Sequence, residues 1–204
     1  MKKRFISILL CLTLLMSSFA CLSGITVNAA TAPAEVGATQ NQQNIVDRAN
    51  YMFNSTWVCK KTVNGWNNKY TFYAGNTYHI PYAWPVSAGA YVGYGISVPD
   101  FLNAAANANS EFYNKRSYLS GASYSYSVYY GNDCSGFVSW CWGASRNTTA
   151  TIPNISSYLG MANTNNSTWT LQLGDALNSI SVGHVVLVTG LSYASNGAIT
   201  QIEA

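Results

Sequence analysis

Charged residues are scarce in this sequence: only 8% of its 204 residues are Asp, Glu, Lys or Arg. Three of the ten cationic residues lie within the first four positions, and the other seven equal the seven acidic residues in number. The chain beyond residue 29 therefore has a net charge near zero and no basic patch. Nucleic-acid-binding proteins need such a patch to neutralise phosphates, so we do not expect a nucleic-acid partner.

Long apolar runs are missing as well. The apolar stretch at residues 5–15 follows a basic start and is too short to span a bilayer comfortably. Residues 27–30 (VNAA) then form a small-residue cleavage site. We interpret residues 1–29 as a secretory signal, which predicts a secreted, extracellular or cell-wall protein with no integral membrane segment once the signal is removed. A membrane anchor and a lipid-modified Cys21 are the alternatives, although Ser18 stands where a large aliphatic residue usually precedes such a cysteine.

The sequence has no closely spaced Cys or His pair of the kind that binds zinc, so we expect neither a metal nor another cofactor. Cys59, Cys134 and Cys141 remain beyond the predicted signal, and an odd count in an exported protein indicates a free thiol. Cys134 and Cys141 lie on one predicted helix, about 10 Å apart, which is too far for a disulfide. A Cys59–Cys141 bridge and two buried thiols both remain open.

The chain beyond the signal is long enough for one domain with a sizeable core. Residues 30–43 are rich in Ala, Thr, Gln and Asn and predict a flexible lead-in, so the folded domain is expected over residues 44–204. Apolar residues at helical spacing predict helices over residues 42–55 and 134–145, with a short helix after residue 98.

The second half of the chain has the pattern of strands. Residues 184–189 (HVVLVT) predict a buried strand, and residues 198–204 predict its hairpin partner across Asn196-Gly197, a strong turn sequence. Helices followed by strands predict an α+β domain. Because residue 204 falls inside the last predicted strand, we expect further strands beyond it and a domain that is C-terminally incomplete in this sequence.

Cys134 is the candidate nucleophile. Cysteine catalysis needs a thiol of low pKa, a neighbouring base and donors for the developing oxyanion. Asp133 or Asn132 can cap the predicted helix, so Cys134 lies at its N-terminus, where the helix dipole is positive and backbone N–H groups are unpaired. Ser135 and Gly136 are small enough for a substrate to approach closely. His184, at the start of a rigid strand, is the candidate base.

Glu203 is the candidate for orienting that base. In an antiparallel hairpin Glu203 shares the face of His184. A tight turn places Glu203 opposite Gly190, about 20 Å from His184 along the strand, which is too far. A wide loop places it opposite Val186, within reach. Glu203 is therefore a third catalytic residue only with a wide loop or a bent hairpin; otherwise the orienting residue lies beyond Ala204.

Four segments resemble motifs of the NlpC-type family of bacterial cell-wall cysteine peptidases. Residues 133–138 (DCSGFV) are similar to the nucleophile motif, and residues 183–185 (GHV) to the histidine motif. Residues 173–177 (LGDAL) are similar to the Gly-Asp turn before the histidine strand, and residues 80–84 (IPYAW) to an upstream segment whose tyrosine lines the active site. Tyr82, Ser135 and Gly183 are thus the candidate substrate-binding residues.

The resemblance implies a papain-like fold, with the nucleophile at a helix N-terminus that packs on an antiparallel sheet. It also implies a monomer that, without a cofactor, hydrolyses peptide bonds between D-glutamate and the diamino acid of peptidoglycan stem peptides. The family commonly has a histidine where this chain has Glu203; a glutamate is more similar to the related cysteine- and histidine-dependent amidases. An N-acetylmuramoyl-L-alanine amidase and an inactive peptidoglycan-binding module therefore remain open, the latter disfavoured by the presence of Cys134 and His184.

Residues 85–131 form a much longer link than the family has between its tyrosine segment and its nucleophile. Both ends of this link must lie near the active-site groove, and long connections anchored at a site are usually functional or disordered. Phe101 and Phe112 belong to an apolar set at helical intervals, so we expect order. The segment is predicted to form one wall of the groove; a surface excursion far from the site is the alternative.

Overall fold

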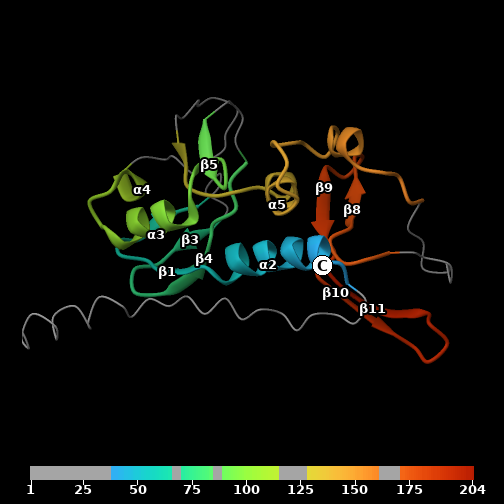
Figure 1. Cartoon of the computed structure of the whole chain (residues 1–204). Helices are drawn as coiled ribbons and strands as arrows, with labels where there is room; N and C mark the ends of the chain where they lie inside the picture. Colours follow the sequence, from blue (N-terminus) through green and yellow to red (C-terminus); the bar gives the residue numbers. More distant parts are fainter. Residues whose placement is uncertain (1–37, 66–69, 85–88, 115–127, 161–170) are drawn as a thin grey trace, which may run out of the picture.

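The computed structural model describes residues 38–65, 70–84, 89–114, 128–160 and 171–204. The predicted secretory signal lies outside these ranges. Figure 1 shows helix α2 (Gln40–Asn54) below helix α5 (Cys134–Cys141), with the short strands and helices that follow α2 to the left and the C-terminal hairpins to the right. Within these ranges, no helix combines the length and the apolarity that a membrane crossing needs.

Helix α2 begins earlier than predicted because Thr39 caps it. The Thr39 hydroxyl accepts a hydrogen bond from the Gln42 backbone N–H, and the Gln42 side chain accepts one from the Thr39 N–H. This reciprocal pair satisfies two of the N–H groups that a helix start leaves free. Residues 40–43, which we predicted as part of the flexible lead-in, are therefore helical.

Between α2 and α5 lies the N-terminal half of the fold, in which the described residues form very short strands and two helices. Strands β1 (Thr56–Val58) and β4 (Thr77–His79) pair antiparallel, as do β2 (Val63–Asn64) and β3 (Thr71–Phe72). Strand β5 (Ala90–Val92) pairs parallel with β6 (Gly95–Ile96) and β7 (Val128–Tyr129). The helices are α3 (Val98–Ala106) and α4 (Glu111–Asn114).

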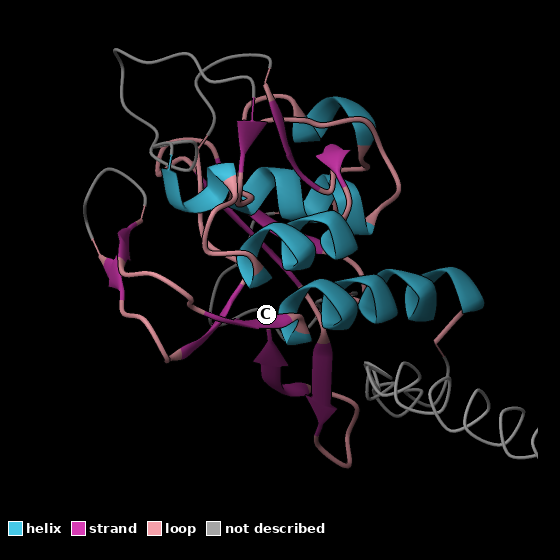
Figure 2. Cartoon of the chain, turned by 90° about the vertical axis from the view of Figure 1, so that its left-hand side faces the viewer, coloured by secondary structure: helices cyan, strands magenta, loops and turns pink. Residues whose placement is uncertain are grey.

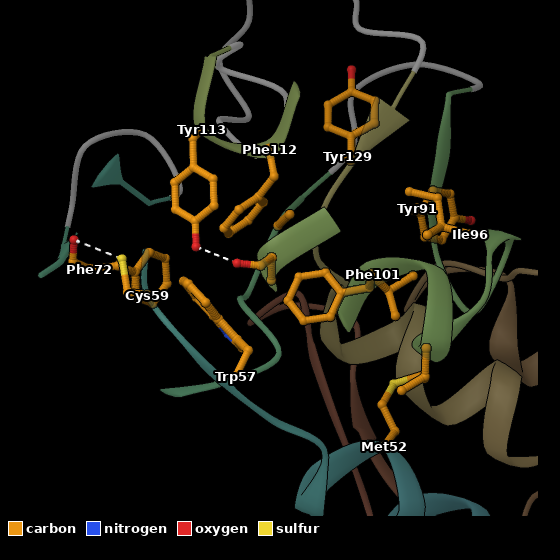
Figure 3. Close-up of a cluster of buried hydrophobic side chains, with 14 residues drawn as sticks. Met52, Trp57, Cys59, Phe72, Tyr91, Ile96, Phe101, Phe112, Tyr113 and Tyr129 are labelled. Carbon is orange, nitrogen blue, oxygen red and sulfur yellow. Dashed lines mark hydrogen bonds between the residues drawn. The ribbon is translucent and has the colours of Figure 1, made fainter. Parts of the chain in front are cut away.

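An aromatic core holds this half together (Figure 3). The Trp57 ring meets the Phe101 and Phe112 rings edge-on, with centroids 6.1 and 5.0 Å away, and both phenylalanines are fully buried. Because Phe101 and Phe112 belong to residues 85–131, the described part of this segment contributes side chains to the core. The predicted order of the segment is confirmed for residues 89–114.

The C-terminal half consists of two hairpins, paired differently from the prediction. Strand β9 (His184–Leu187) pairs with β8 (Ala176–Ser179), and β11 (Ile199–Glu203) pairs with β10 (Gly190–Tyr193). The predicted direct pairing of residues 184–189 with 198–204 is wrong because the strand is interrupted between β9 and β10. Figure 2 shows the C-terminal hairpin extending away from the helices.

Helix α5 lies between the two halves and packs against α2 and β9. It ends four residues before the predicted end because Gly143 adopts a left-handed φ of 69°, the conformation that commonly ends a helix. Its buried face belongs to a second apolar core, made of Ala49, Val138, Cys141, Ile152, Val185 and Leu187. Ile152 comes from the 3-10 helix η2 (Ile152–Ile155). The predicted α+β class is confirmed.

Candidate active site

Asp133 caps helix α5 and fixes the position of Cys134, its first residue. One carboxylate oxygen of Asp133 accepts hydrogen bonds from the Gly136 N–H at 2.6 Å and the Ser135 hydroxyl at 3.2 Å. The other oxygen pairs with the Arg146 guanidinium. Asp133 is only 4% exposed. This buried carboxylate therefore connects the first turn of α5, through one oxygen, to Arg146, through the other.

Gly136 is required at this helix start for steric reasons. A Cβ atom on residue 136 would lie 2.1 Å from the Asn132 Oδ1 atom and 2.9 Å from the Asp133 Oδ1 atom. The same Asn132 oxygen accepts a hydrogen bond from the Asp133 N–H at 2.8 Å. Gly136 thus leaves room for the capping groups, which is a different role from the substrate access that the sequence suggested.

Tyr82 lies against Cys134. The segment around Tyr82 runs beside the nucleophile motif, because the Ala83 N–H donates to the Asn132 carbonyl at 3.0 Å and the Asn132 N–H donates to the Pro81 carbonyl at 3.1 Å. The Tyr82 phenol hydrogen-bonds Cys134; burial, with Cys134 and Asp133 nearby, raises the pKa of Tyr82 to about 12. The phenol therefore stays protonated at neutral pH and can donate.

Arg146 is a site residue that we did not predict. Its guanidinium pairs with Asp133 and lies over the Tyr91 ring, 5.2 Å from the ring centroid. Burial lowers the pKa of Arg146, and the nearby Tyr82 acts in the opposite direction. Burial raises the pKa of Asp133, against which the hydrogen bonds from Gly136 and Ser135 act. One sequence feature could have drawn attention to Arg146, because it is the only Lys or Arg after residue 116.

The loop that carries Arg146 is held against α5. The Tyr94 hydroxyl donates to the Ala144 carbonyl at 3.0 Å, and burial raises the pKa of Tyr94 to about 12. Ser139, fully buried on α5, accepts a hydrogen bond from the Asn147 N–H at 3.1 Å. Tyr91 and Tyr94 both belong to residues 85–131, so part of that segment borders the site.

His184 begins the strand that packs on α5. Val185 and Leu187 belong to the apolar core that Cys134 also contacts. Burial alternates along β9: Val185 and Leu187 are buried, whereas His184, at the start of the strand, is exposed. No hydrogen bond joins the His184 ring to Cys134 among the described residues. The structure packs α5, which carries Cys134, against β9, which carries His184.

Gly183 closes the turn before His184. It has a left-handed φ of 72°, and a Cβ atom there would meet no atom within 4 Å. Its N–H donates to the Ser179 carbonyl at 2.9 Å, which completes the β8–β9 turn. This conformational role accounts for a glycine here without a contact to substrate.

Glu203 is not brought to His184. Glu203 pairs with Gly190, the register that a tight turn predicts, and the Ala194 N–H closes the turn on the Ala198 carbonyl at 2.8 Å. The Glu203 carboxylate accepts a hydrogen bond from the Thr189 hydroxyl at 2.9 Å. Glu203 lies opposite Gly190 and not opposite Val186, so the wide loop is not formed, and among the described residues no hydrogen bond joins Glu203 to His184 across the bend between β9 and β10.

The other two cysteines are buried thiols. Cys59, Cys134 and Cys141 are all free, so the Cys59–Cys141 bridge is not formed. Burial raises the pKa of Cys141 to about 12, and burial also raises the pKa of Cys59. Cys134 is less buried than either, which distinguishes it as the accessible thiol of the three.

Within the described ranges, no group of three or more His, Cys, Asp or Glu side chains is arranged to hold a metal ion. Comparisons with protein-family models, curated proteins and solved structures find no match for this chain. The case for a function therefore depends on the geometry around Cys134.

Proposed function

We propose that this protein is a secreted cysteine peptidase with a papain-like arrangement that hydrolyses amide bonds in peptidoglycan stem peptides. One observation carries the proposal: Cys134 is the first residue of a helix whose buried cap is Asp133, and Tyr82 hydrogen-bonds its thiol. A structural cysteine has no need of a helix N-terminus and a phenol donor, whereas a nucleophile uses both.

In the proposed reaction, Cys134 Sγ attacks the carbonyl carbon of the scissile amide and His184 takes up the thiol proton. His184 then gives this proton to the departing amine, which leaves a thioester on Cys134. Water, deprotonated by His184, cleaves the thioester and releases the carboxylic acid. The free N–H groups at the start of α5 and the Tyr82 hydroxyl stabilise the oxyanion. Catalytic hydrogen bonds are often formed only with substrate bound, so the exposed His184 ring must turn toward Sγ at that stage.

Replacing Tyr82 with phenylalanine is expected to lower kcat by on the order of 100-fold, the usual effect of removing one oxyanion donor. Tyr113→Phe is the matched control, since its hydroxyl bonds the Ala105 carbonyl at 2.6 Å in the N-terminal core. The control should lower the melting temperature while kcat stays unchanged. An unchanged kcat in Tyr82→Phe would exclude the phenol from the reaction.

Replacing Glu203 with alanine or glutamine is expected to leave kcat/KM close to that of wild type, because the Glu203 carboxylate has no hydrogen bond to Cys134 or His184 among the described residues. The carboxylate is exposed and bonds Thr189, not His184. Steady-state kinetics on a soluble stem peptide measure this. A loss of tenfold or more in both variants would show that Glu203 does act on the base.

The position of Glu203 also bears on the amidase alternative. The argument for an N-acetylmuramoyl-L-alanine amidase was a glutamate as the third catalytic residue. The Glu203 carboxylate instead accepts a hydrogen bond from the Thr189 hydroxyl at 2.9 Å, which weakens that argument. We therefore propose the peptidase, with residues 85–131 contributing Tyr91 and Tyr94 to one wall of the groove.

Digesting purified peptidoglycan with the full chain and analysing the fragments by mass spectrometry tests the function. A peptidase of the proposed kind releases fragments cut between D-glutamate and the diamino acid, with a new amino group on the latter. An amidase would instead release whole stem peptides from the glycan. Binding without any soluble fragment would identify an inactive module.

A further inference from the structure

Arg146 is a cation placed beside the nucleophile. One of its nitrogens pairs with Asp133, the residue before Cys134, and its guanidinium lies over the Tyr91 ring. Its charge acts on Tyr82, the residue whose phenol hydrogen-bonds Cys134. The Arg146 side chain is 21% exposed, whereas that of Asp133 is 4% exposed.

The charges around Arg146 leave a positive excess. The Asp133 carboxylate has two positive partners: the guanidinium and the N-terminus of α5, which carries roughly half a unit charge. Arg146 has one recorded anionic partner, Asp133. A guanidinium has five N–H donors; the bond to Asp133 uses one terminal nitrogen of Arg146, and the Nε–H is buried without a partner among the described residues. The ion pair with Asp133 therefore leaves a net positive charge at this place, and it uses only one of the guanidinium nitrogens of Arg146.

We propose that Arg146 binds a carboxylate of the substrate next to the scissile amide and so sets a preference for acidic stem peptides. This inference rests on the proposed peptidase function. The planar fork of a guanidinium matches a carboxylate and forms charge-assisted hydrogen bonds with it. A carboxamide at the same place has no charge and offers one acceptor oxygen in place of two, so it binds less well.

Two synthetic peptides test the proposal: L-alanyl-γ-D-glutamyl-L-lysine, and the same peptide with the D-glutamyl α-carboxylate converted to a carboxamide. Wild type is expected to cleave the carboxylate peptide with a kcat/KM roughly 10- to 100-fold higher, the range for losing a charge-assisted hydrogen bond. Removing Arg146 alone would leave Asp133 buried and unpaired. The test variant is therefore the double substitution Asp133→Asn with Arg146→Met, which removes both charges and keeps a capping oxygen.

Two single variants complete the design. Arg146→Lys keeps the charge without the fork, and we expect it to fold and to retain a reduced preference even if the double variant is unstable. Arg48→Met is the control, because the Arg48 side chain bonds the Cys141 carbonyl at the other end of α5. Arg48→Met should keep the full preference for the carboxylate peptide.

The expected result is that the double variant cleaves the two peptides equally well, whatever its overall turnover, because the loss of Arg146 affects the carboxylate peptide more than the carboxamide peptide. A parallel loss on both peptides, with the preference kept, would make Arg146 purely structural and overturn the inference. Equal cleavage of both peptides by wild type would overturn it too, while the peptidase function stands. If wild type cleaves neither peptide, the proposed function fails and the inference fails with it.

Discussion

Replacing Cys134 with alanine is expected to reduce peptidoglycan hydrolysis by roughly four or more orders of magnitude, as removal of a catalytic nucleophile does in other hydrolases. The reason is chemical, since alanine has no group that can form the thioester. The domain should stay folded, because Cys134 is only partly buried and the Asp133 cap does not depend on its side chain. Turbidity loss of a peptidoglycan suspension measures activity, and circular dichroism measures folding.

Cys141→Ala is the matched control on the same helix. Cys141 is fully buried in the second core, so its truncation should lower the free energy of unfolding by about 1 kcal/mol. Turnover per folded molecule should remain that of wild type. The mechanism would be contradicted by substantial hydrolysis in Cys134→Ala, or by equal losses of turnover in the two variants.

Replacing Asp133 with alanine should have the largest effect on stability. It leaves the partly buried Arg146 without its anion and the Gly136 N–H without its acceptor. Breaking a buried ion pair from one side costs about 3–5 kcal/mol, a large share of the about 5–15 kcal/mol that stabilises a domain. Urea unfolding followed by tryptophan fluorescence measures the loss.

A double-mutant cycle separates the cap from the ion pair. Asp133→Asn keeps an acceptor for the Gly136 N–H but leaves Arg146 unpaired, so it should cost less than Asp133→Ala. Adding Arg146→Met to Asp133→Asn should recover part of that cost, because no charge is then left unpaired. Additive losses, or a cost below about 1 kcal/mol for Asp133→Ala, would contradict a buried and coupled pair.

The sequence predicted the elements that have a clear period or a local start signal. Helix α2 follows the apolar spacing that includes Val46, Ala49 and Met52. Helix α5 begins at Cys134, as the Asp133 cap predicts. The strands of the N-terminal half are two or three residues long, too short to show an alternation.

Strand pairing could not be predicted with the same success. Asn196-Gly197 is a correct turn signal, but it does not say where the preceding strand is interrupted. The break follows Leu187, where the Val188 N–H donates to the Asp175 carbonyl at 2.8 Å, a contact with residues 13 positions earlier. Strand β8 is partly buried along its whole length and has no alternation, so its pairing with β9 was not predicted.

The candidate site likewise contains residues that the sequence predicts and one that it does not. Cys134 and Tyr82 belong to local motifs, and the structure brings them into contact. Arg146 pairs with Asp133 from 13 residues away, through a loop held by Tyr94 and Ser139. Such a pair depends on the path of the loop between α5 and Arg146, which its residues Gly143, Ala144 and Ser145 do not specify.

Peptide mapping after partial alkylation tests the central claim, that Cys134 is the nucleophile, most directly. Burial raises the pKa of Cys141 to about 12, so almost none of this thiol is ionised at pH 8, and Cys59 is buried as well. With limiting iodoacetamide we predict that Cys134 is modified first and that activity falls in proportion to its modification. Full activity in protein whose Cys134 is completely alkylated would contradict the claim.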